Sequence, residues 1–374
     1  MSWFEACFDA LPDPRTGNAK QHDLLELLTI ALTASICGAQ RCSDFADFAV
    51  DSEDLFREFL DLENGVPSHD TFSRVFRLLD PDAFATCFTR FVDHLGELGT
   101  DMVAIDAKTL RRSYDAAAGR SRLEAVTAFS PETGTVIGHK SFRSGEGGSE
   151  IEAARQLLRC LDLRGTLVTG DAIHCQHETA QSVLDQGGDY LFAVKDTWPV
   201  LHREVAEAFT HQDPGSLDFQ ETNDSGHGRV EVRRHWVSHE VDWLTAGRGE
   251  AGMSKPPPGV RAVAMAESEV TRAGRTSRQK RHYICSGAIS AERFADAVRR
   301  HWAIENTLHW VLDETFDEDQ ARNRTDNGPE NLTILCKLAL NVLQRSRRNI
   351  SVRRKRKRCG WSNEFARSIL GQVG

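Results

Sequence analysis

Three acidic residues, Asp106, Asp171 and Glu305, stand where carboxylates could carry out metal-dependent chemistry. Asp106 follows the apolar run Met102–Ile105, and Asp171 follows the run TLVTG that begins at Thr166. Each is therefore expected at the C-terminal end of a short strand, the edge where open α/β sheets collect catalytic groups. An aspartate after a strand is also a common turn residue that needs no function.

If the two strands are neighbours, the carboxylates of Asp106 and Asp171 come within a few ångströms of each other. Two such groups repel unless one is protonated or a divalent cation lies between them. Oxygen ligands that leave room for water suit Mg²⁺ or Mn²⁺. Two such ions, about 4 Å apart, can activate a water or a 3′-hydroxyl and stabilise the leaving oxygen of a phosphodiester.

Glu305 lies in the stretch 299–314, RRHWAIENTLHWVLDE. Apolar and aromatic residues recur at three and four positions and cover much of its surface, which predicts one buried helix. A buried carboxylate needs a charge partner or a metal, and this favours Glu305 as a third ligand. His301, Glu305 and His309 also form a stripe that could bind zinc or two irons, but no second matched helix accompanies it.

A second histidine-rich stretch, His174-Cys175-Gln176-His177-Glu178, matches no standard zinc spacing. A helix that starts beside Asp171 explains it better.

The three acidic residues lie within residues 99–345, which have a mixed α/β pattern. Strands are predicted at 102–105, 123–129, 135–142, 166–169 and 190–194, with helices at 149–161 and 174–185. Residues 200–285 form a β-rich insertion, with strand-like runs at 229–237, 260–267 and 282–284. Its basic cluster could touch a phosphate backbone or be a solvated hairpin: Arg272, Arg275, Arg278, Lys280 and Arg281.

Residues 1–98 have only helical patterns. Asp23 is a predicted N-cap for the helix 24–37, and Ser68 caps a helix that begins near Thr71. Further helices are predicted at 43–48, 53–60 and 82–98. Short helices with tight turns could form a DNA-reading helix-turn-helix, or a packing or oligomerisation domain.

Charge is distributed unevenly over the 374 residues, whose net charge is −9. Residues 1–100 hold 18 acidic and 7 basic residues, a net charge of −11, whereas the remainder has a net charge of +2. The segment 345–358 carries nine basic residues and no acid. Residues 346–374 are therefore predicted to be a basic tail that binds nucleic acid or only solubilises the chain.

The composition is that of a soluble protein, with 40% hydrophobic and 27% charged residues. No apolar run approaches the roughly 20 residues of a membrane span, and the N-terminus does not resemble a signal peptide. The nine cysteines form no CxxC pair, which favours reduced thiols and a cytoplasmic location.

Four motifs together resemble one known family. They are Ile105-Asp106-Ala107-Lys108-Thr109-Leu110-Arg111, Gly170-Asp171-Ala172, Asp189-Tyr190-Leu191-Phe192-Ala193-Val194-Lys195 and the stretch from His301 to Trp310. They are similar to the DDE transposases of ISAs-type insertion sequences, a group that includes the H-repeat-associated proteins. The resemblance covers roughly residues 5–345, and residues 1–98 are similar to the helical domain that precedes the catalytic domain.

The resemblance implies an RNase H-like core in which Asp106, Asp171 and Glu305 bind two Mg²⁺ ions, with Mn²⁺ as a substitute. The enzyme would cut at the terminal inverted repeats of its own element and join the 3′-hydroxyls to target DNA. Synapsis of two ends would favour a homodimer on DNA. The DNA would be expected to meet a set of basic residues: Lys108, Arg111, Lys195, Arg322 and Arg324.

The chain departs from the family pattern at several positions. Ala107 stands where glycine is usual, and Asp196-Thr197 replaces Asn-Gln. Related transposases carry Tyr, Arg, Glu and Lys along the last helix. With Glu305 aligned, this chain has Val298, His301 and Leu312 at the other three positions. Two other functions therefore remain open: a DNA-binding descendant without catalysis, and a metal-dependent nuclease without strand transfer.

Overall fold

A computed structural model of the chain describes residues 2–95, 100–226, 229–244 and 255–371. The chain divides into two compact units, each built from segments that are distant in sequence. The first unit comprises residues 1–100, 107–153 and 305–374, and the second comprises residues 101–106 and 154–304. The domain boundaries predicted from sequence, at residues 98 and 345, remain predictions.

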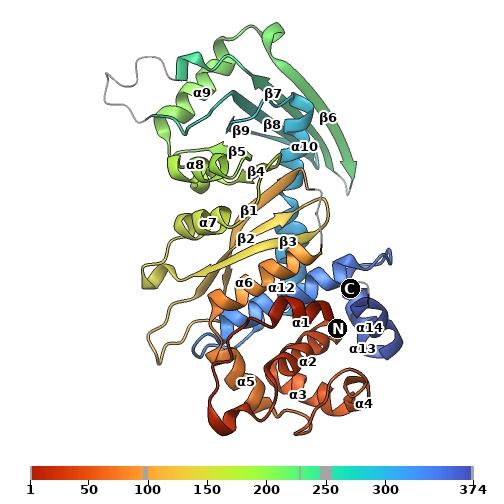
Figure 1. Cartoon of the computed structure of the whole chain (residues 1–374). Coiled ribbons are helices and arrows are strands. Elements are labelled where there is room, and N and C mark those ends of the chain that lie inside the picture. Colours follow the sequence, from red (N-terminus) through yellow and green to blue (C-terminus); the bar gives the residue numbers. More distant parts are fainter. Residues whose placement is uncertain (1, 96–99, 227–228, 245–254, 372–374) are drawn as a thin grey trace. The chain divides into compact units, whose positions relative to one another are not determined.

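The first unit is mainly helical (Figure 1). Its N-terminal helices are α1 (Ser2–Phe8), α2 (Leu24–Cys37), α3 (Cys42–Asp51), α4 (Glu53–Phe56), α5 (His69–Leu78) and α6 (Pro81–His94). Its C-terminal helices are α11 (Trp310–Phe316), α12 (Gly328–Arg345), α13 (Val352–Trp361) and α14 (Asn363–Leu370). A hairpin of β2 (Leu123–Ser130) and β3 (Thr135–Phe142) completes it, with short helical turns at Gly17–Lys20, Ser144–Glu146 and Glu318–Gln320.

The long helix α12 is the centre of the first unit. It packs against α2, α5, α6 and β3, and most of its residues are buried. Buried amides fix it: Asn341 donates to the carbonyl of Val136 and accepts from its N–H, at 2.8 and 2.9 Å. Asn331 donates to the carbonyls of Phe76 and Leu79. These bonds join residues that are more than 200 positions apart in sequence.

Two helix starts predicted in residues 1–98 from capping side chains are confirmed. The Asp23 side chain accepts from the N–H of Glu26 at the start of α2, and Ser68 does the same for Thr71 in α5. The helix predicted at 53–60 is shorter, because α4 has four residues. The end of the helix predicted at 82–98 falls partly outside the described residues.

The basic segment after residue 345 is not an extended tail. It folds into α13 and α14, and α13 packs on α2 and α12. Arg356 is buried and donates to the carbonyls of Ser35, Ala39 and Thr315. Lys355 is also buried and donates to two carbonyls at the end of α12. Two of the nine cations are therefore structural.

The second unit is a sheet with helices on both faces. Its further strands are β4 (Leu167–Gly170), β5 (Asp189–Val194), β6 (Asp218–Gly226), β7 (Arg229–Ser238), β8 (Ala262–Arg272) and β9 (Arg275–Cys285), beside the start of β1 (Met102–Leu110). Its helices are α8 (His177–Asp185), α9 (Pro199–His211), α10 (Ala291–His301) and most of α7 (Glu150–Arg159). Short helical turns lie at Ala172–His174, Pro214–Ser216 and Asp242–Leu244.

The nine strands of the described residues follow the order β3-β2-β1-β4-β5-β9-β8-β7-β6, in which both units share β1. β1, β4 and β5 are parallel, and β9, β8, β7 and β6 continue antiparallel. The mixed α/β pattern with a helical N-terminal region is thus confirmed. One strand was missed, because β6 lies in a polar stretch, residues 211–227, that is rich in Gly, Ser and Asp.

Helix α10 covers one face of the antiparallel strands. Phe294 of α10 packs edge-on against Tyr283 and His235, inside an apolar cluster that also holds Leu191 and Val237. Helix α9 contacts β8 and β9 on the other face, where His202 lies 3.1 Å from His282. The two faces are therefore built from alternating residues of each strand.

In the described residues no single helix is long and apolar enough to cross a membrane. Helices α2 and α3 together reach the length and composition, but they are bent by 92°. All nine cysteines are free thiols.

Candidate active site

The parallel pairing of β1 and β4 places the first two carboxylates side by side. In the register of these strands Ile105 is opposite Gly170, so Asp106 and Asp171 occupy the next equivalent positions. Equivalent positions on adjacent parallel strands send their side chains to the same face of the sheet. Gly170 has little room for a side chain, because an added Cβ would lie 3.2 Å from both Ile105 and His174. The two strands are therefore neighbours, which is the condition under which Asp106 and Asp171 were expected to approach each other.

The position of Asp106 differs from the prediction in one respect. β1 does not end at Ile105 but continues to Leu110, so that Asp106 lies inside a nine-residue strand. Only residues 102–105 pair with β4, which ends at Gly170. Asp106 is half-buried, whereas the Asp171 side chain is 59% exposed. The carboxyl end of β4, rather than that of β1, forms the edge.

Lys195 follows β5 directly and faces the same edge. Its Nζ lies 4.0 Å from a carboxylate oxygen of Asp171, and its side chain is 55% exposed. An exposed ammonium beside an exposed carboxylate can exchange that partner for a phosphate at small cost. The structure thus places Lys195 where a phosphate contact next to Asp171 is feasible.

His301, which the sequence offered as part of a metal-binding stripe and as a departure from the family pattern, lies at this edge. It is the last residue of α10, and its Nδ1 is 2.8 Å from the hydroxyl of Thr169, two residues before Asp171. Burial lowers the pKa of His301 to about 4, although Asp171 acts to raise it. A neutral imidazole therefore holds Thr169 at neutral pH. Its spacing of four before Glu305 was the available sequence signal.

Arg281 and Tyr283 border the same region from β9. The pKa of Tyr283 is raised, mainly by burial. Arg281 opposes this shift and Asp171 adds to it. The guanidinium of Arg281 lies 4.8 Å from the ring centre of Trp302, a favourable cation–π distance. Asp171, Arg281 and Trp302 therefore border one corner of the second unit.

Glu305 has a different setting from the one predicted. Instead of one helix over 299–314, α10 ends at His301, a π-helical turn spans Ile304–His309, and α11 begins at Trp310. Glu305 is exposed, and so are Trp302 (39%) and Trp310 (56%). The prediction of a buried helix was wrong, because apolar residues on all sides were read as burial. π-turns occur frequently at functional sites.

The π-turn also changes the histidine–glutamate stripe, because it breaks the regular spacing of an α-helix across residues 301–309. Within the described ranges, no three His, Cys, Asp or Glu side chains are grouped closely enough to hold a metal ion. At the stretch 174–178 the chain forms a short turn followed by α8, as the simpler interpretation predicted.

Lys108, a predicted phosphate contact, is surrounded by acids. Its Nζ lies 2.7 Å from Asp313, 3.1 Å from Asp319 and 3.2 Å from Glu318, and the side chain is 11% exposed. Burial would lower the pKa of Lys108, but Glu318 and Asp313 outweigh burial and raise it. Lys337 lies 4.0 Å from Glu318 on the other side. Lys108 is thus the central cation of an ion cluster in the first unit.

The other predicted DNA contacts are distributed over the first unit. Arg111 pairs with Asp319 at 3.1 Å, but its side chain is 78% exposed. Arg322 is exposed. Arg324 donates to the carbonyl of Arg112 and lies 4.6 Å from the ring centre of Tyr114. Arg111 and Arg322 therefore remain accessible to a ligand, whereas Arg324 is engaged within the protein.

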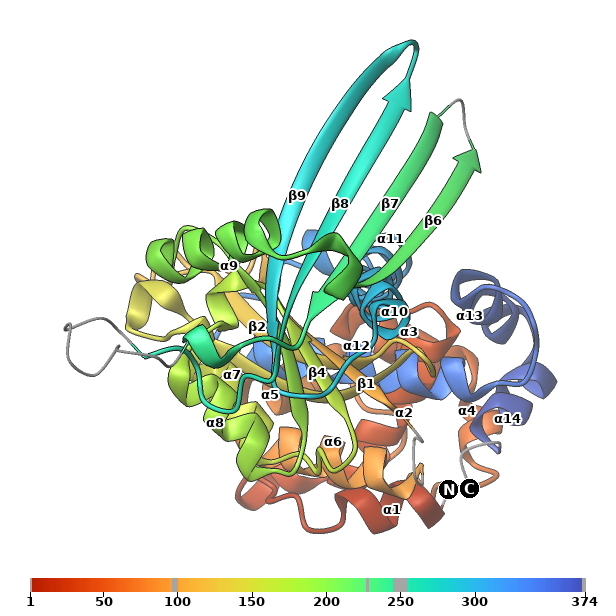
Figure 2. The same ribbon diagram turned by 90° about the horizontal axis from the view of Figure 1, so that it is seen from above.

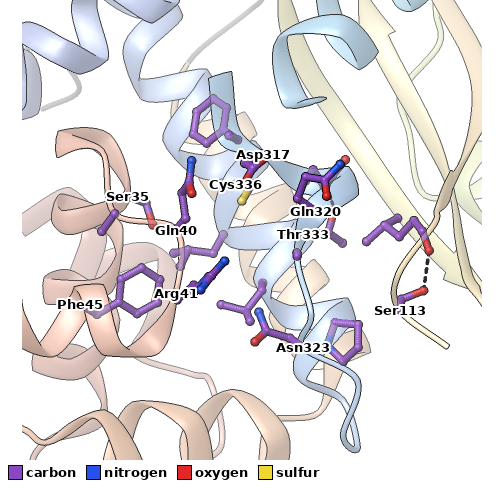
Figure 3. Close-up of a pocket in the computed structure, with 18 residues that line it drawn as sticks. Ser35, Gln40, Arg41, Phe45, Ser113, Asp317, Gln320, Asn323, Thr333 and Cys336 are labelled. Carbon is purple, nitrogen blue, oxygen red and sulfur yellow. Dashed lines mark hydrogen bonds between the residues drawn. The ribbon is translucent and has the colours of Figure 1, made fainter. Parts of the chain in front are cut away.

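A small pocket of about 40 Å³ lies elsewhere in the first unit (Figure 3). Ser35, Arg41 and Phe45 line it from the N-terminal helices, and Thr333 and Cys336 line it from α12. This volume holds only one or a few waters, and none of the predicted catalytic or DNA-binding residues lines it. The pocket therefore does not compete with the carboxylate edge as a candidate active site.

Comparison with known proteins gives two family matches. The family described as "DDE_Tnp_1-associated" matches residues 5–92, and "Transposase DDE domain" matches residues 97–214 and 222–342. The "H repeat-associated putative transposase YhhI" of Escherichia coli K12 is 34% identical over 97% of this chain and 96% of its own length. The "Uncharacterized protein in dhlA 3'region" of Xanthobacter autotrophicus is 38% identical over 75% of this chain and 92% of its own. The "Inactive transposase YbfQ" of E. coli K12 is 38% identical over 64 residues, which are 17% of this chain and 76% of its own length.

Proposed function

This chain belongs to the DDE transposase family, and on that premise we propose that it cleaves the ends of an insertion sequence and joins their 3′-hydroxyls to target DNA. Asp106, Asp171 and Glu305 are the proposed catalytic carboxylates. The observation that carries the proposal is the parallel register of β1 and β4, in which Ile105 is opposite Gly170 and Asp106 and Asp171 are the next residues. This register supports the proposal that both acids face the same side of the sheet.

An RNase H-like core is part of this proposal. Along the chain, β1, β2 and β3 are followed by α7, β4, α8 and β5, and both β4 and β5 run parallel to β1. The four strands β6–β9 then lie between β5 and the segment that carries Glu305. This order supports an RNase H-like core interrupted by a β-rich insertion.

The donor atoms fit a divalent cation. Asp106 and Asp171 offer hard oxygen ligands at one position of the sheet, and the exposure of Asp171 leaves room for water, as Mg²⁺ requires. Glu305, whose side chain is exposed, is the proposed third ligand. When bound, Mg²⁺ or its substitute Mn²⁺ would activate the attacking oxygen and stabilise the leaving oxygen of the phosphodiester.

The residues around Asp171 would position the DNA. Lys195 is proposed to bind a phosphate beside the scissile bond, where a cation stabilises developing negative charge. His301 would hold Thr169, and with it the end of β4, without adding positive charge. Arg111 and Arg322 are proposed as more distant phosphate contacts. A homodimer on DNA, which synapsis of two ends favours, is proposed for the active assembly.

A DNA-binding protein without catalysis is the second candidate. One relative carries the name "Inactive transposase YbfQ". In this chain Val298, His301 and Leu312 also stand where related transposases carry Tyr, Arg and Lys. This candidate predicts that DNA binding persists without cleavage and that Asp106→Asn has no effect on any activity of the protein.

The test uses the full chain and a labelled duplex that carries the inverted repeats flanking its gene. Cleavage is assayed with Mg²⁺, with Mn²⁺ and with EDTA. Asp171→Asn is compared with Asp196→Asn, which changes an exposed carboxylate close to Lys195 in the same way. We expect metal-dependent cuts at the repeat ends that Asp171→Asn abolishes and Asp196→Asn preserves.

Three results would contradict the proposal. Binding without cutting would support the second candidate. Cuts that ignore the repeats would indicate a nuclease without strand transfer. Equal cleavage by the two variants would remove Asp171 from the site.

A further inference from the structure

Strands β6–β9 form a four-stranded arm whose outer half extends past the helices of the second unit (Figure 2). Its register is continuous along all three strand pairs. Residues of one parity on each strand therefore share a face, and residues of the other parity share the opposite face. The basic residues of the arm, which looked like one cluster in the sequence, divide between these two faces.

On one face of the arm the positive and negative charges balance. It carries three acids and three bases, and each takes part in an ion pair. Arg234 lies within 3.2 Å of Glu221, Glu267 and Glu269. On β9, Arg278 lies 3.0 Å from Glu269, and Lys280 lies 3.7 Å from Glu267. This ion-paired face contacts α9 at its base through His282.

The opposite face, which contacts α10 at its base, has unbalanced charge. At the outer end of the arm Arg229 is opposite Arg272, and Arg272 is opposite Arg275. Like charges directly across a strand pair destabilise a sheet. This row of three arginines therefore does not stabilise the fold. Arg229 has Glu231 at 3.5 Å, but Arg272 and Arg275 have no acidic partner among the described residues. We call this surface the arginine face.

The turn of the β8–β9 hairpin fixes the orientation of this arginine row. Ala273 and Gly274 both have positive φ, +48° and +73°, as in the two-residue type I′ turn that matches strand twist. Arg272 and Arg275 are the residues that close this turn, and both are exposed. A tight turn therefore holds the two guanidinium groups on one side.

The arginine face leads from the outer end of the arm to the candidate active site. Arg275, Arg281 and Tyr283 have the same parity on β9, and Arg281 lies at the corner with Trp302 and Asp171. From Tyr283 to Arg275 is eight residues, about 27 Å at 3.4 Å per residue. This length corresponds to about eight base pairs of duplex, which carry one negative charge per ~1.7 Å of axis.

We propose that the arginine face binds the phosphate backbone of duplex DNA and guides the duplex toward Asp171. The inference rests on the proposed function for the identity of the ligand. A row of exposed arginines in which Arg272 and Arg275 have no acidic partner among the described residues fits a line of phosphates. On the ion-paired face every charged side chain already has a partner. The arm thus has a DNA side and a structural side.

The test compares two double variants of the full chain that remove the same charge from the same hairpin. R272Q/R275Q changes the arginine face, and R278Q/K280Q changes the ion-paired face. Binding of a fluorescent 30-base-pair duplex without the inverted repeats is measured in EDTA at a series of KCl concentrations. Thermal melting of each variant verifies that it is folded.

Each phosphate contact contributes about 0.9 to the slope of log Kobs against log[salt]. We expect R272Q/R275Q to reduce the magnitude of this slope by about 1.8 and to weaken binding at 0.1 M salt by tens of fold. The R278Q/K280Q slope is expected to equal that of the unchanged chain.

Equal losses in both variants would overturn the inference, because net charge alone would then explain binding. Unchanged slopes in both would also overturn it. The catalytic proposal is tested separately, since no metal is present in this assay. A chain that binds through Arg272 and Arg275 but does not cleave would support the inference and contradict the proposed function.

Discussion

Replacing Lys108 by methionine separates two roles for this residue, a structural cation and a phosphate contact. Lys108 lies within 3.2 Å of Asp313, Asp319 and Glu318, and it is mostly buried. Methionine keeps the length of the side chain but removes the charge, so the three carboxylates lose their common partner. Removing one member of a buried ion pair costs about 3–5 kcal/mol.

The lower end of this range applies, because Lys337 stays 4.0 Å from Glu318 and keeps part of the compensation. We therefore expect Lys108→Met to lower the free energy of unfolding by about 3 kcal/mol at pH 7. The cost should shrink in acid. Burial raises the pKa of Glu318, but Lys337 and Lys108 outweigh it and lower the pKa. The stability gained from that carboxylate is therefore present above its unfolded pKa, near 4.3, and lost as the pH falls through its folded pKa.

Urea unfolding followed by circular dichroism, at pH 7 and again at pH 4, measures both quantities. A double-mutant cycle with Glu318→Gln should give a coupling energy of about 1–3 kcal/mol. The matched control is Arg111→Met, which removes a cation paired with Asp319 from a side chain that is 78% exposed. Unchanged stability of Lys108→Met together with a loss of DNA affinity would refute the structural role and restore the phosphate contact predicted from sequence.

Three further predictions concern the candidate site and the core. Glu305→Gln should abolish DNA cleavage yet change the free energy of unfolding by less than about 0.5 kcal/mol, because Glu305 is exposed; cleavage and urea assays of one preparation decide this. The pKa of His301 is near 4 in the fold and 6.5 in the unfolded chain, so the unfolded chain binds the proton more tightly. The free energy of unfolding should therefore fall by up to about 3 kcal/mol as the pH falls from 6.5 to 4. His301→Gln should flatten the pH dependence of unfolding over that range, and an unaltered curve would contradict the assigned burial. Asn341→Leu should cost about 2–4 kcal/mol in urea unfolding, because the buried N–H and C=O of Val136 both lose their partner; a loss below 1 kcal/mol would contradict it.

Local signals predicted the parts of the fold that depend on a few consecutive residues. The caps Asp23 and Ser68 satisfy N–H groups three residues later in the chain, and the hairpin strands at 123–130 and 135–142 flank a turn with glycine. The length of β1 was underestimated because its apolar run ends at Ile105, whereas the strand continues to Leu110. Strand ends depend on partners, which composition does not specify.

Glu305 shows a second limit of sequence patterns. Apolar residues at α-helical spacing predicted one continuous helix, yet the structure inserts a π-turn from Ile304 to His309. That turn contains no glycine or proline, so no strong helix breaker indicates the change. Exposure of Trp302 and Trp310 follows from surroundings that the linear pattern does not contain. The role of Glu305 stays a prediction, whereas the buried environment predicted for it was wrong.

Basic residues show most clearly what a sequence alone leaves undecided. The sequence alone predicts that Lys108, Arg356 and Arg272 contact solvent or phosphate. Their partners decide otherwise: Lys108 meets three acids, Arg356 meets three backbone carbonyls, and Arg272 meets only other arginines. Two of these cations already have compensation inside the fold, and binding a phosphate would require breaking it. Arg272 has none, and like-charge repulsion across the strands makes an anion favourable there. The net charge of a segment is therefore a weaker guide to DNA contacts than the strand register, which assigns each cation to an acid or to open solvent.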